Sequence, residues 1–407
     1  MVELRKSTGL TKSALKRVIL FGMFRLVGKQ RGKTVAVADI GSGSVGVAIL
    51  ATSAKGPANV IVAEHAILPL EERTPEANLS GILGKLDEGA QKALAGYAAM
   101  SGARAAHVSH AYAVVRAPWT RSKTMRVEHA FETDTRIEKS MILALAKQAL
   151  EEDKDLDHTK IFEASVVRVE LNGYPTAKPE GKHARHIAVS VLLSESAGSV
   201  RSGVAETLSR VFACPPPTLR SGTRALLTVL KENDVLKKYC FVVDMGAQAT
   251  SLVTVRKDVA TDIVHVPEGS HTILKRIAGD KMPEETLTMM RMLAHGECEK
   301  DACDAIMQAL ARAEADLVRI FGEAMANMAA SRRLPNDLLL FAPADMADWL
   351  VQFFSRIDFA QFTITTRPFS PRVESGKGLT GSLTFANDVR LDSDLSIASA
   401  LVNIDGI

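Results

Sequence analysis

The sequence predicts an α/β protein made of two similar halves that face each other across a cleft. At 407 residues, with 46% hydrophobic and 24% charged residues, the chain suits a soluble globular protein of several subdomains. Predicted strands and helices alternate along it. A strand, an Asp-x-Gly turn and a second strand occur twice, with Asp39 in one copy and Asp244 in the other, 205 positions apart (244 − 39). A motif repeated half a chain apart implies two related halves.

The first copy is a β-hairpin. An apolar strand, Thr34–Ile40, leads into the turn Gly41-Ser42-Gly43-Ser44, and a second apolar run, Val45–Leu50, follows. Glycine and serine let the backbone turn tightly, so that N–H groups can form a concave nest for an anion. A nearby carboxylate such as Asp39 can hold Mg²⁺ through water. This stretch therefore predicts a site for a nucleotide phosphate.

After the hairpin, residues 34–109 continue as a first α/β subdomain. Asn59–Leu68 is predicted to be a strand and Glu76–Ser101 an amphipathic helix. Residues 110–198 show a different order of predicted elements, which indicates an inserted strand–helix–strand–strand module. Its predicted elements are a strand over His110–Pro118, a helix over Thr135–Asp153 and strands over Ile161–Leu171 and Arg185–Leu193.

Residues 199–239 are predicted to return to the first half and to contain a connecting helix, Leu219–Leu230. The second hairpin, Cys240–Val255, opens a second α/β subdomain over residues 240–280. Periodicity predicts a helical subdomain over 281–333. Residues 334–407 complete the second half, with an apolar strand at Asp337–Phe341 and a closing helix at Leu391–Asn403.

Two phosphate hairpins in one chain resemble the actin/Hsp70/hexokinase superfamily, whose halves are actin-like (ribonuclease H-like) and enclose a nucleotide. The strand–helix–strand–strand insert resembles the SHS2 module of two of its families, FtsA and PilM. The turn Asn172-Gly-Tyr-Pro-x₃-Pro179-x-Gly181-Lys182-x₂-Arg185 resembles a turn of FtsA. The Gly-Ala-x-Ala-Thr form of the second hairpin is closer to PilM. The resemblance covers roughly residues 34–403.

The resemblance implies ATP and Mg²⁺ as cofactors, with Mg²⁺ held through water by Asp39 and Asp244. The implied nucleotide contacts are Asp39, Gly41, Ser42, Gly43, Ser44, Asp244, Gly246 and Thr250. The second hairpin reads Asp244-Met-Gly-Ala-Gln-Ala-Thr-Ser251, where FtsA has D-I-G-G-G-T-T-D. Lost glycines hinder the approach of a phosphate, and a lost acid removes a group that could orient water. These departures predict weak binding with little or no hydrolysis.

Two functions remain open at this point. The first is an FtsA- or PilM-type scaffold at the cytoplasmic membrane face, which binds ATP weakly and recruits cell-division or type IV pilus components. Such a scaffold is expected to self-associate through its inserted module. The second is an active ATPase or small-molecule kinase of the same superfamily, although no convincing general base stands out. The basic N-terminal arm lacks interleaved aromatic readers, so nucleic acid is not expected as a partner.

Residues 1–33 form a basic, apolar arm with nine Lys/Arg residues and one acid, Glu3, a net charge of +8 (9 − 1) within a total of +3. Residues 11–33 are predicted to touch an anionic membrane surface, or else to pack on the protein body. The four cysteines, Cys214, Cys240, Cys298 and Cys303, form no CxxC pair. They are predicted to be reduced thiols in the cytoplasm, and a zinc site with His295 is disfavoured by their spacing.

Overall fold

A computed structural model describes residues 33–53, 56–71, 73–101, 107–375, 381–386 and 389–405. The predicted arm at residues 1–32 lies outside them. Two compact units are present, one containing residues 120–198 and the other the remaining described residues. No helix in the described ranges is both long and apolar enough to cross a membrane.

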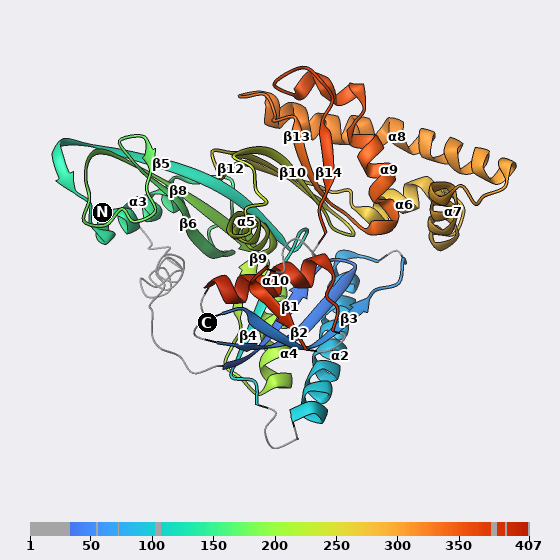
Figure 1. Ribbon diagram of the computed structural model, residues 1–407, viewed down its shortest axis with the longest axis horizontal. Helices are drawn as coiled ribbons and strands as arrows, with labels where there is room; N and C mark the ends of the chain where they lie inside the picture. Colours follow the sequence, from blue (N-terminus) through green and yellow to red (C-terminus); the bar gives the residue numbers. More distant parts are fainter. Residues whose placement is uncertain are drawn as a thin grey trace, which may run out of the picture. The chain divides into compact units, whose positions relative to one another are not determined.

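The first sheet of the larger unit has six strands in the order β15-β3-β2-β1-β4-β9. The hairpin β1–β2 and the next strand β3 are antiparallel, whereas β4 and β9 run parallel to β1. Helix α2 packs on one face of this sheet and α10 on the other (Figure 1). The bounds are β1 Lys33–Ile40, β2 Ser44–Thr52, β3 Ala58–Ile67, α2 Pro75–Ser101, β4 His110–Val115, α4 Gly198–Phe212, β9 Thr218–Ser221, α5 Gly222–Glu232, β15 Leu383–Phe385 and α10 Ser393–Asp405.

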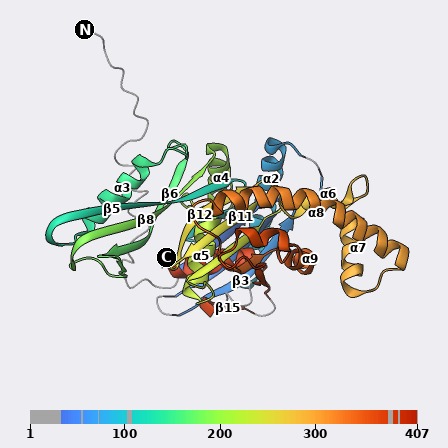
Figure 2. The same cartoon turned by 90° about the horizontal axis from the view of Figure 1, so that it is seen from above.

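The second sheet has five strands in the order β12-β11-β10-β13-β14. The hairpin β10–β11 repeats the geometry of β1–β2, and β13 runs parallel to β10 as β4 does to β1. Figure 2 shows the long helix α8, with α7 beside its N-terminal end. The bounds are β10 Tyr239–Met245, β11 Thr250–Arg256, β12 Val259–Val266, α6 Ser270–Ala278, α7 Pro283–His295, α8 Lys300–Ala329, β13 Asp337–Phe341, α9 Ala344–Phe354, the 3₁₀ helix Ile357–Phe362 and β14 Ser370–Val373.

One hydrophobic core joins the two sheets of the larger unit. It contains buried side chains of β1 and β2, of β10 and β11, and of the helices α5 and α10. Helix α10 is apolar almost all round, from Leu395 to Val402, because it is covered on both sides. The predicted two related halves are therefore confirmed, and their hairpins are held by one continuous core.

The smaller unit is a four-stranded antiparallel sheet in the order β5-β8-β6-β7, with helix α3 packed on it. Thr120, the first residue of β5, pairs with Ser196, the last residue of β8, so the chain enters and leaves this unit at neighbouring positions. Bounds are β5 Thr120–Arg136, α3 Lys139–Glu152, β6 Ile161–Leu171, β7 Tyr174–Pro175 and β8 His183–Ser196.

The structure corrects the predicted start of this insert. The strand predicted at His110–Pro118 is β4, which pairs with β1 in the first sheet. The insert begins instead with β5, a long strand rich in exposed polar residues that gives no clear apolar alternation. The N-terminal part of the helix predicted from Thr135 belongs to this strand. The remaining subdivision of the larger unit stays a prediction.

The predicted reduced state of the cysteines is also corrected. Cys298, in the segment between α7 and α8, and Cys303, in the first turn of α8, are joined in a disulfide, with their Cα atoms 5.6 Å apart. This separation lies within the range that a disulfide spans, although the two residues are not a CxxC pair. Cys214 and Cys240 are free and buried.

Candidate functional site

The two hairpins meet at the carboxyl ends of β1, β4 and β10. Asp39 is the last but one residue of β1, and Asp244 holds the same place in β10. Between them lies Arg116, which follows the last residue of β4 and whose backbone N–H donates to the carbonyl of Ile40 (3.0 Å). Because the carboxyl ends of parallel strands lie at one edge of a sheet, the neighbouring strands β1 and β4 place Arg116 beside Asp39.

Arg116 is the centre of an ion cluster that is buried at Asp39 and partly exposed at Asp394, whose side chain is 43% exposed. Its Nε donates to Asp39 Oδ1 at 2.7 Å, and its Nη2 lies 3.2 Å from Asp394 Oδ1 and donates to the Asp394 carbonyl. Its Nη1 lies 3.6 Å from Asp244 Oδ2, beyond hydrogen-bond distance, and has no hydrogen-bond partner within the described part of the chain. Arg116 is only 6% exposed and Asp39 only 3%. One guanidinium thus faces three carboxylates.

Three carboxyl groups face one guanidinium, so a single positive charge cannot neutralise all of them. Burial raises the pKa of Asp39 to about 8 and that of Asp244 to about 6, although Arg116 opposes both shifts. The pKa of Asp394 is raised for the same reason. Burial alone would lower the pKa of Arg116, but the charges of Asp39, Asp394 and Asp244 raise it. Arg116 is therefore permanently charged, and some of the carboxyl groups around it retain protons near neutral pH.

The start of α10 carries a second pair, which is partly exposed. Asp392 accepts a hydrogen bond from the backbone N–H of Leu395 (2.7 Å), as an N-cap residue does. Its other oxygen lies 2.8 Å from His65 Nε2. Burial opposes ionisation of Asp392, but the hydrogen bond with His65 and the Leu395 N–H keep its pKa below the ordinary value. The hydrogen bond with Asp392 raises the pKa of His65.

The tips of the hairpins contact each other directly. The backbone N–H of Gln248, in the second turn, donates to Ser42 Oγ in the first turn (3.0 Å). Asn78, at the start of α2, donates through Nδ2 to the Ser42 carbonyl (3.2 Å) and to Gln248 Oε1 (3.1 Å). Ser42, which was predicted to contact a phosphate, is thus bonded to the second turn and to α2 instead.

Glycines allow this close approach. A Cβ at Gly43 would lie 2.5 Å from Ala247 Cβ and 2.7 Å from His271 Cε1. A Cβ at Gly222, the first residue of α5, would lie 2.8 Å from Arg116 Cγ. Contacts this short do not occur between real side-chain atoms. Gly43 therefore permits contact between the two turns, and Gly222 makes room for the stem of Arg116.

The structure brings the predicted nucleotide-binding residues together, but they contact other groups of the protein. Asp39 and Asp244 face Arg116, Ser42 accepts from Gln248, and the Gly43 Cα abuts Ala247. The Gly41 N–H donates to Ser44 O and the Gly246 N–H to Ala249 O, which closes each turn, while the Thr250 hydroxyl donates to Glu268 O.

Mg-ATP, the cofactor that the fold implies, does not fit this arrangement. The carboxylates that would hold the waters of Mg²⁺ face a guanidinium. The two turns that would clamp the phosphates touch each other.

Four residues of this site were not predicted from the sequence: Arg116, Asp394, Asn78 and Gln248. Arg116 carries a signal that could have revealed it, because a charged residue directly after the apolar strand Ala111–Val115 is placed at the same sheet edge as Asp39. Asp394 lies 355 positions after Asp39 (394 − 39), and nothing in its local sequence marks the contact. Asn78 and Gln248 are single amides without a recognisable motif.

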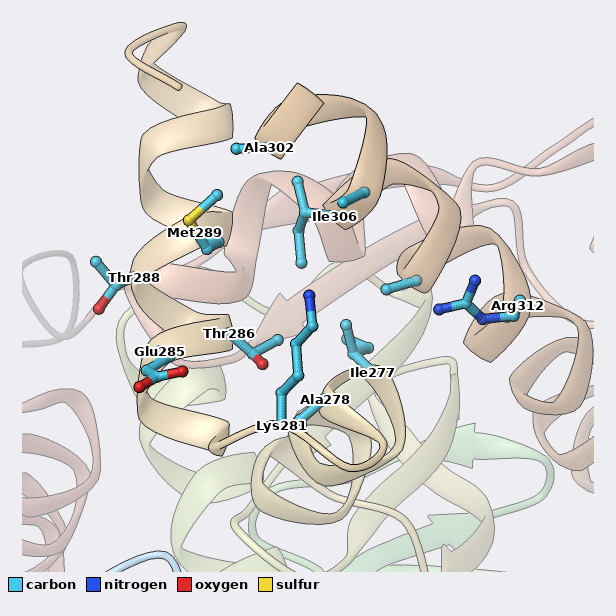
Figure 3. Close-up of a pocket in the computed structure, with 12 residues that line it drawn as sticks. Ile277, Ala278, Lys281, Glu285, Thr286, Thr288, Met289, Ala302, Ile306 and Arg312 are labelled. Carbon is cyan, nitrogen blue, oxygen red and sulfur yellow. The ribbon is translucent and has the colours of Figure 1, made fainter. Parts of the chain in front are cut away.

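A separate pocket lies among α6, α7 and α8 (Figure 3). Its volume is about 620 Å³, and its walls are mostly apolar, with Ile277, Met289 and Ile306 among them. In Figure 3 the side chain of Lys281 points into the space between the helices, and Arg312 lies at one side of the pocket. The pocket contains none of the residues predicted to bind nucleotide, so it is distinct from the hairpin site.

Comparison with known proteins gives the fold. No protein-family model and no curated protein sequence matches the chain. Among solved structures, the PilM–PilN type IV pilus biogenesis complex matches with a TM-score of 0.57 and 14% identity, covering 92% of this chain and 98% of that one. The ethanolamine utilization protein EutJ from Carboxydothermus hydrogenoformans matches with a TM-score of 0.42 and 12% identity, covering 96% of each chain. The predicted resemblance is confirmed at the level of fold: this chain has the two-lobed, actin-like fold of the PilM type.

Proposed function

We propose that this chain is an actin-like scaffold which recruits a protein partner and does not run an ATPase cycle. The observation that carries the proposal is the guanidinium of Arg116, seated between the hairpin acids Asp39 and Asp244. Phosphoryl transfer needs a cavity in which phosphates, metal and acceptor are held in line. Here side chains of the protein itself occupy the place where the two hairpins meet.

The alternative function, an ATPase or kinase, lacks a base in a usable position. Asp39 has a raised pKa, as a general base requires, but its carboxylate faces Arg116 and is only 3% exposed. A general base must reach the proton of a bound nucleophile. We therefore propose an ATPase or kinase only as the second candidate function.

For the partner contact we propose the smaller unit. Strand β5 lies at the edge of its sheet and is paired only with β8 within the described residues. It is 17 residues long and largely polar. An exposed sheet edge can receive an extended peptide through main-chain hydrogen bonds. That the similar structure is a complex of PilM with PilN supports a protein partner.

The proposed setting is a pilus-assembly machinery, with cell division as the alternative. The PilM–PilN similarity favours the first, whereas the turn Asn172–Arg185 resembles FtsA. Attachment to the inner face of the cell membrane through residues 11–33, and self-association through the inserted unit, belong to the same proposal. Neighbouring genes that encode pilus components or a tubulin-like division protein would distinguish the two settings.

Phosphate release separates scaffold from enzyme. The full chain is incubated with Mg-ATP beside a variant that carries Asp39→Asn and Asp244→Asn, which keeps the shape of both side chains but removes their charge. We expect equal, background release over several turnovers. Faster release by the unaltered chain would refute the scaffold proposal.

Partner recruitment is tested by replacing Arg121–Glu195 with a short glycine–serine linker. The replacement is feasible because Thr120 and Ser196 are paired neighbours. Capture from an extract of the source cells, followed by mass spectrometry, should recover pilus or division proteins with the full chain and lose them with the shortened one. Equal recovery by both proteins would place the contact elsewhere.

A further inference from the structure

The Arg116 cluster bridges segments that come from both halves of the larger unit. Asp39 belongs to the first hairpin, Asp244 to the second, and Asp394 to the start of the closing helix α10. In a two-lobed fold, a group that contacts all three segments resists their separation. The hairpin tips are also linked by hydrogen bonds among Ser42, Asn78 and Gln248.

The chain is adapted to hold Arg116 in this place. Gly222 leaves room for its aliphatic stem, because any Cβ there would overlap Arg116 Cγ at 2.8 Å. The hydrogen bond from its backbone N–H to Ile40 O fixes where the side chain begins. A buried guanidinium needs several acceptors to offset its lost hydration, and the cluster provides carboxylate oxygens from Asp39 and Asp394 together with the Asp394 carbonyl.

The charge of the cluster also opposes a nucleotide. Three carboxyl groups surround one guanidinium, so the site is not a positive pocket for a polyanion. A Mg²⁺ ion would have to displace Arg116 from Asp39, and a phosphate would have to separate Gly43 from Ala247. Each change breaks contacts of the closed arrangement before any contact with the ligand forms.

We infer that Arg116 is a built-in substitute for the magnesium–nucleotide ligand, which holds the two halves together permanently and makes the closed form independent of nucleotide. The positive charge that Mg²⁺ would bring to the hairpin acids is carried by the protein. This inference concerns the larger unit alone and does not depend on which partner the smaller unit recruits.

The first test is nucleotide binding by the unaltered full chain. Thermal unfolding and calorimetric titration are performed with Mg-ATP, Mg-ADP and Mg²⁺ alone at millimolar concentrations. A ligand that binds the folded state raises the melting temperature, so we expect neither a shift nor binding heat. A clear rise with Mg-ATP, lost in the Asp39→Asn variant, would overturn the inference and support the weak binding that the hairpin sequence predicts.

The second test removes the bridge. Arg116→Ala should lower the melting temperature by several degrees, and millimolar ethylguanidinium, which can enter the vacated space, should restore part of the loss. The control is Arg356→Ala, which removes an arginine whose pair with Glu314 is partly exposed. This control should lose little stability and should not respond to ethylguanidinium, because removal of an exposed side chain leaves no enclosed space for the ligand.

An unchanged melting temperature in Arg116→Ala, or an equal response to ethylguanidinium in both variants, would contradict the bridging role. If Arg116→Ala does not fold, Arg116→Lys is used instead. Lysine keeps the charge, but its ammonium group lacks the planar, forked donors with which arginine reaches several acceptors. The lysine variant should therefore fold with a lower melting temperature than the unaltered chain. A lysine variant as stable as arginine would overturn the inference.

Discussion

Replacing Asp244 by asparagine should make the protein more stable at alkaline pH. Asp244 is the farthest of the three acids from Arg116, at 3.6 Å, and its side chain is 15% exposed. Its pKa is raised from 3.8 to about 6 in the folded protein, chiefly by burial. The folded state thus binds a proton more tightly than the unfolded state, and Asp244 costs stability once that proton is lost.

The magnitude follows from the shift. The contribution of Asp244 to the free energy of unfolding is complete below its unfolded pKa of 3.8 and is lost as the pH rises through about 6. A shift of about 2 pH units corresponds to about 3 kcal/mol at pH values well above 6. An asparagine side chain at this position stays neutral at every pH and avoids this loss. We therefore expect Asp244→Asn to match the unaltered chain near pH 4 and to exceed it by about 1–3 kcal/mol near pH 8.

Urea unfolding followed by circular dichroism, at a series of pH values from acid to alkaline, measures this difference. The control is Asp392→Asn, because the pKa of Asp392 is lowered by His65 and the Leu395 N–H, and asparagine can still cap α10. That variant should lose stability above the unfolded pKa of Asp392 and recover as the pH falls. The reasoning is refuted if Asp244→Asn is no more stable than the unaltered chain at pH 8, or if its gain does not depend on pH.

Three further predictions test other parts of the structure. Gly222→Ala should cost about 1–3 kcal/mol in urea unfolding, because its Cβ meets the Arg116 stem, whereas Gly84→Ala, whose Cβ meets no described atom within 4 Å in helix α2, should gain about 0.5–1 kcal/mol. His65→Gln should lower the melting temperature below pH 6.5, because protonated His65 stabilises the folded state at those pH values. The effect should disappear as the pH rises through the raised pKa of His65. In liposome sedimentation, the full chain should pellet with anionic vesicles at low salt and less at high salt, whereas a protein starting at Thr34 should stay in the supernatant; equal pelleting would exclude the N-terminal arm as an anchor.

The fold could be predicted because its signals are local. The hairpin β1–β2 is an apolar run, a Gly/Ser turn and another apolar run, and α2 is an amphipathic helix, so composition and periodicity alone identify both. The predicted bounds of β3 and α2 differ from those in the structure by a residue. Strand β5 was missed because its exposed face and edge position leave few apolar residues to mark it. Helix α9 and the short strands β14 and β15 gave too little pattern to be assigned.

The site could be predicted only in part. A sequence motif indicates which ligand a turn could bind, but it does not show which side chains of the same protein already fill that space. Asp39 and Asp244 were expected to lie together, and the structure places both beside Arg116. Their partner comes from a third strand, and the next acid comes from a helix at the end of the chain. Such contacts are set by the packing of distant segments, which no local pattern encodes.

The retained hairpins and the lost glycines have a common physical explanation. If the hairpins hold the two halves together, selection for closure keeps the strands, Asp39 and the close contact at Gly43, because each supports the Arg116 bridge. It does not keep the additional glycines of the second turn, since no phosphate has to approach the backbone there. Ala247 illustrates this, because its methyl group packs against Gly43 where a phosphate clamp would need open space. The same substitution that weakens a nucleotide site therefore strengthens the contact between the two turns.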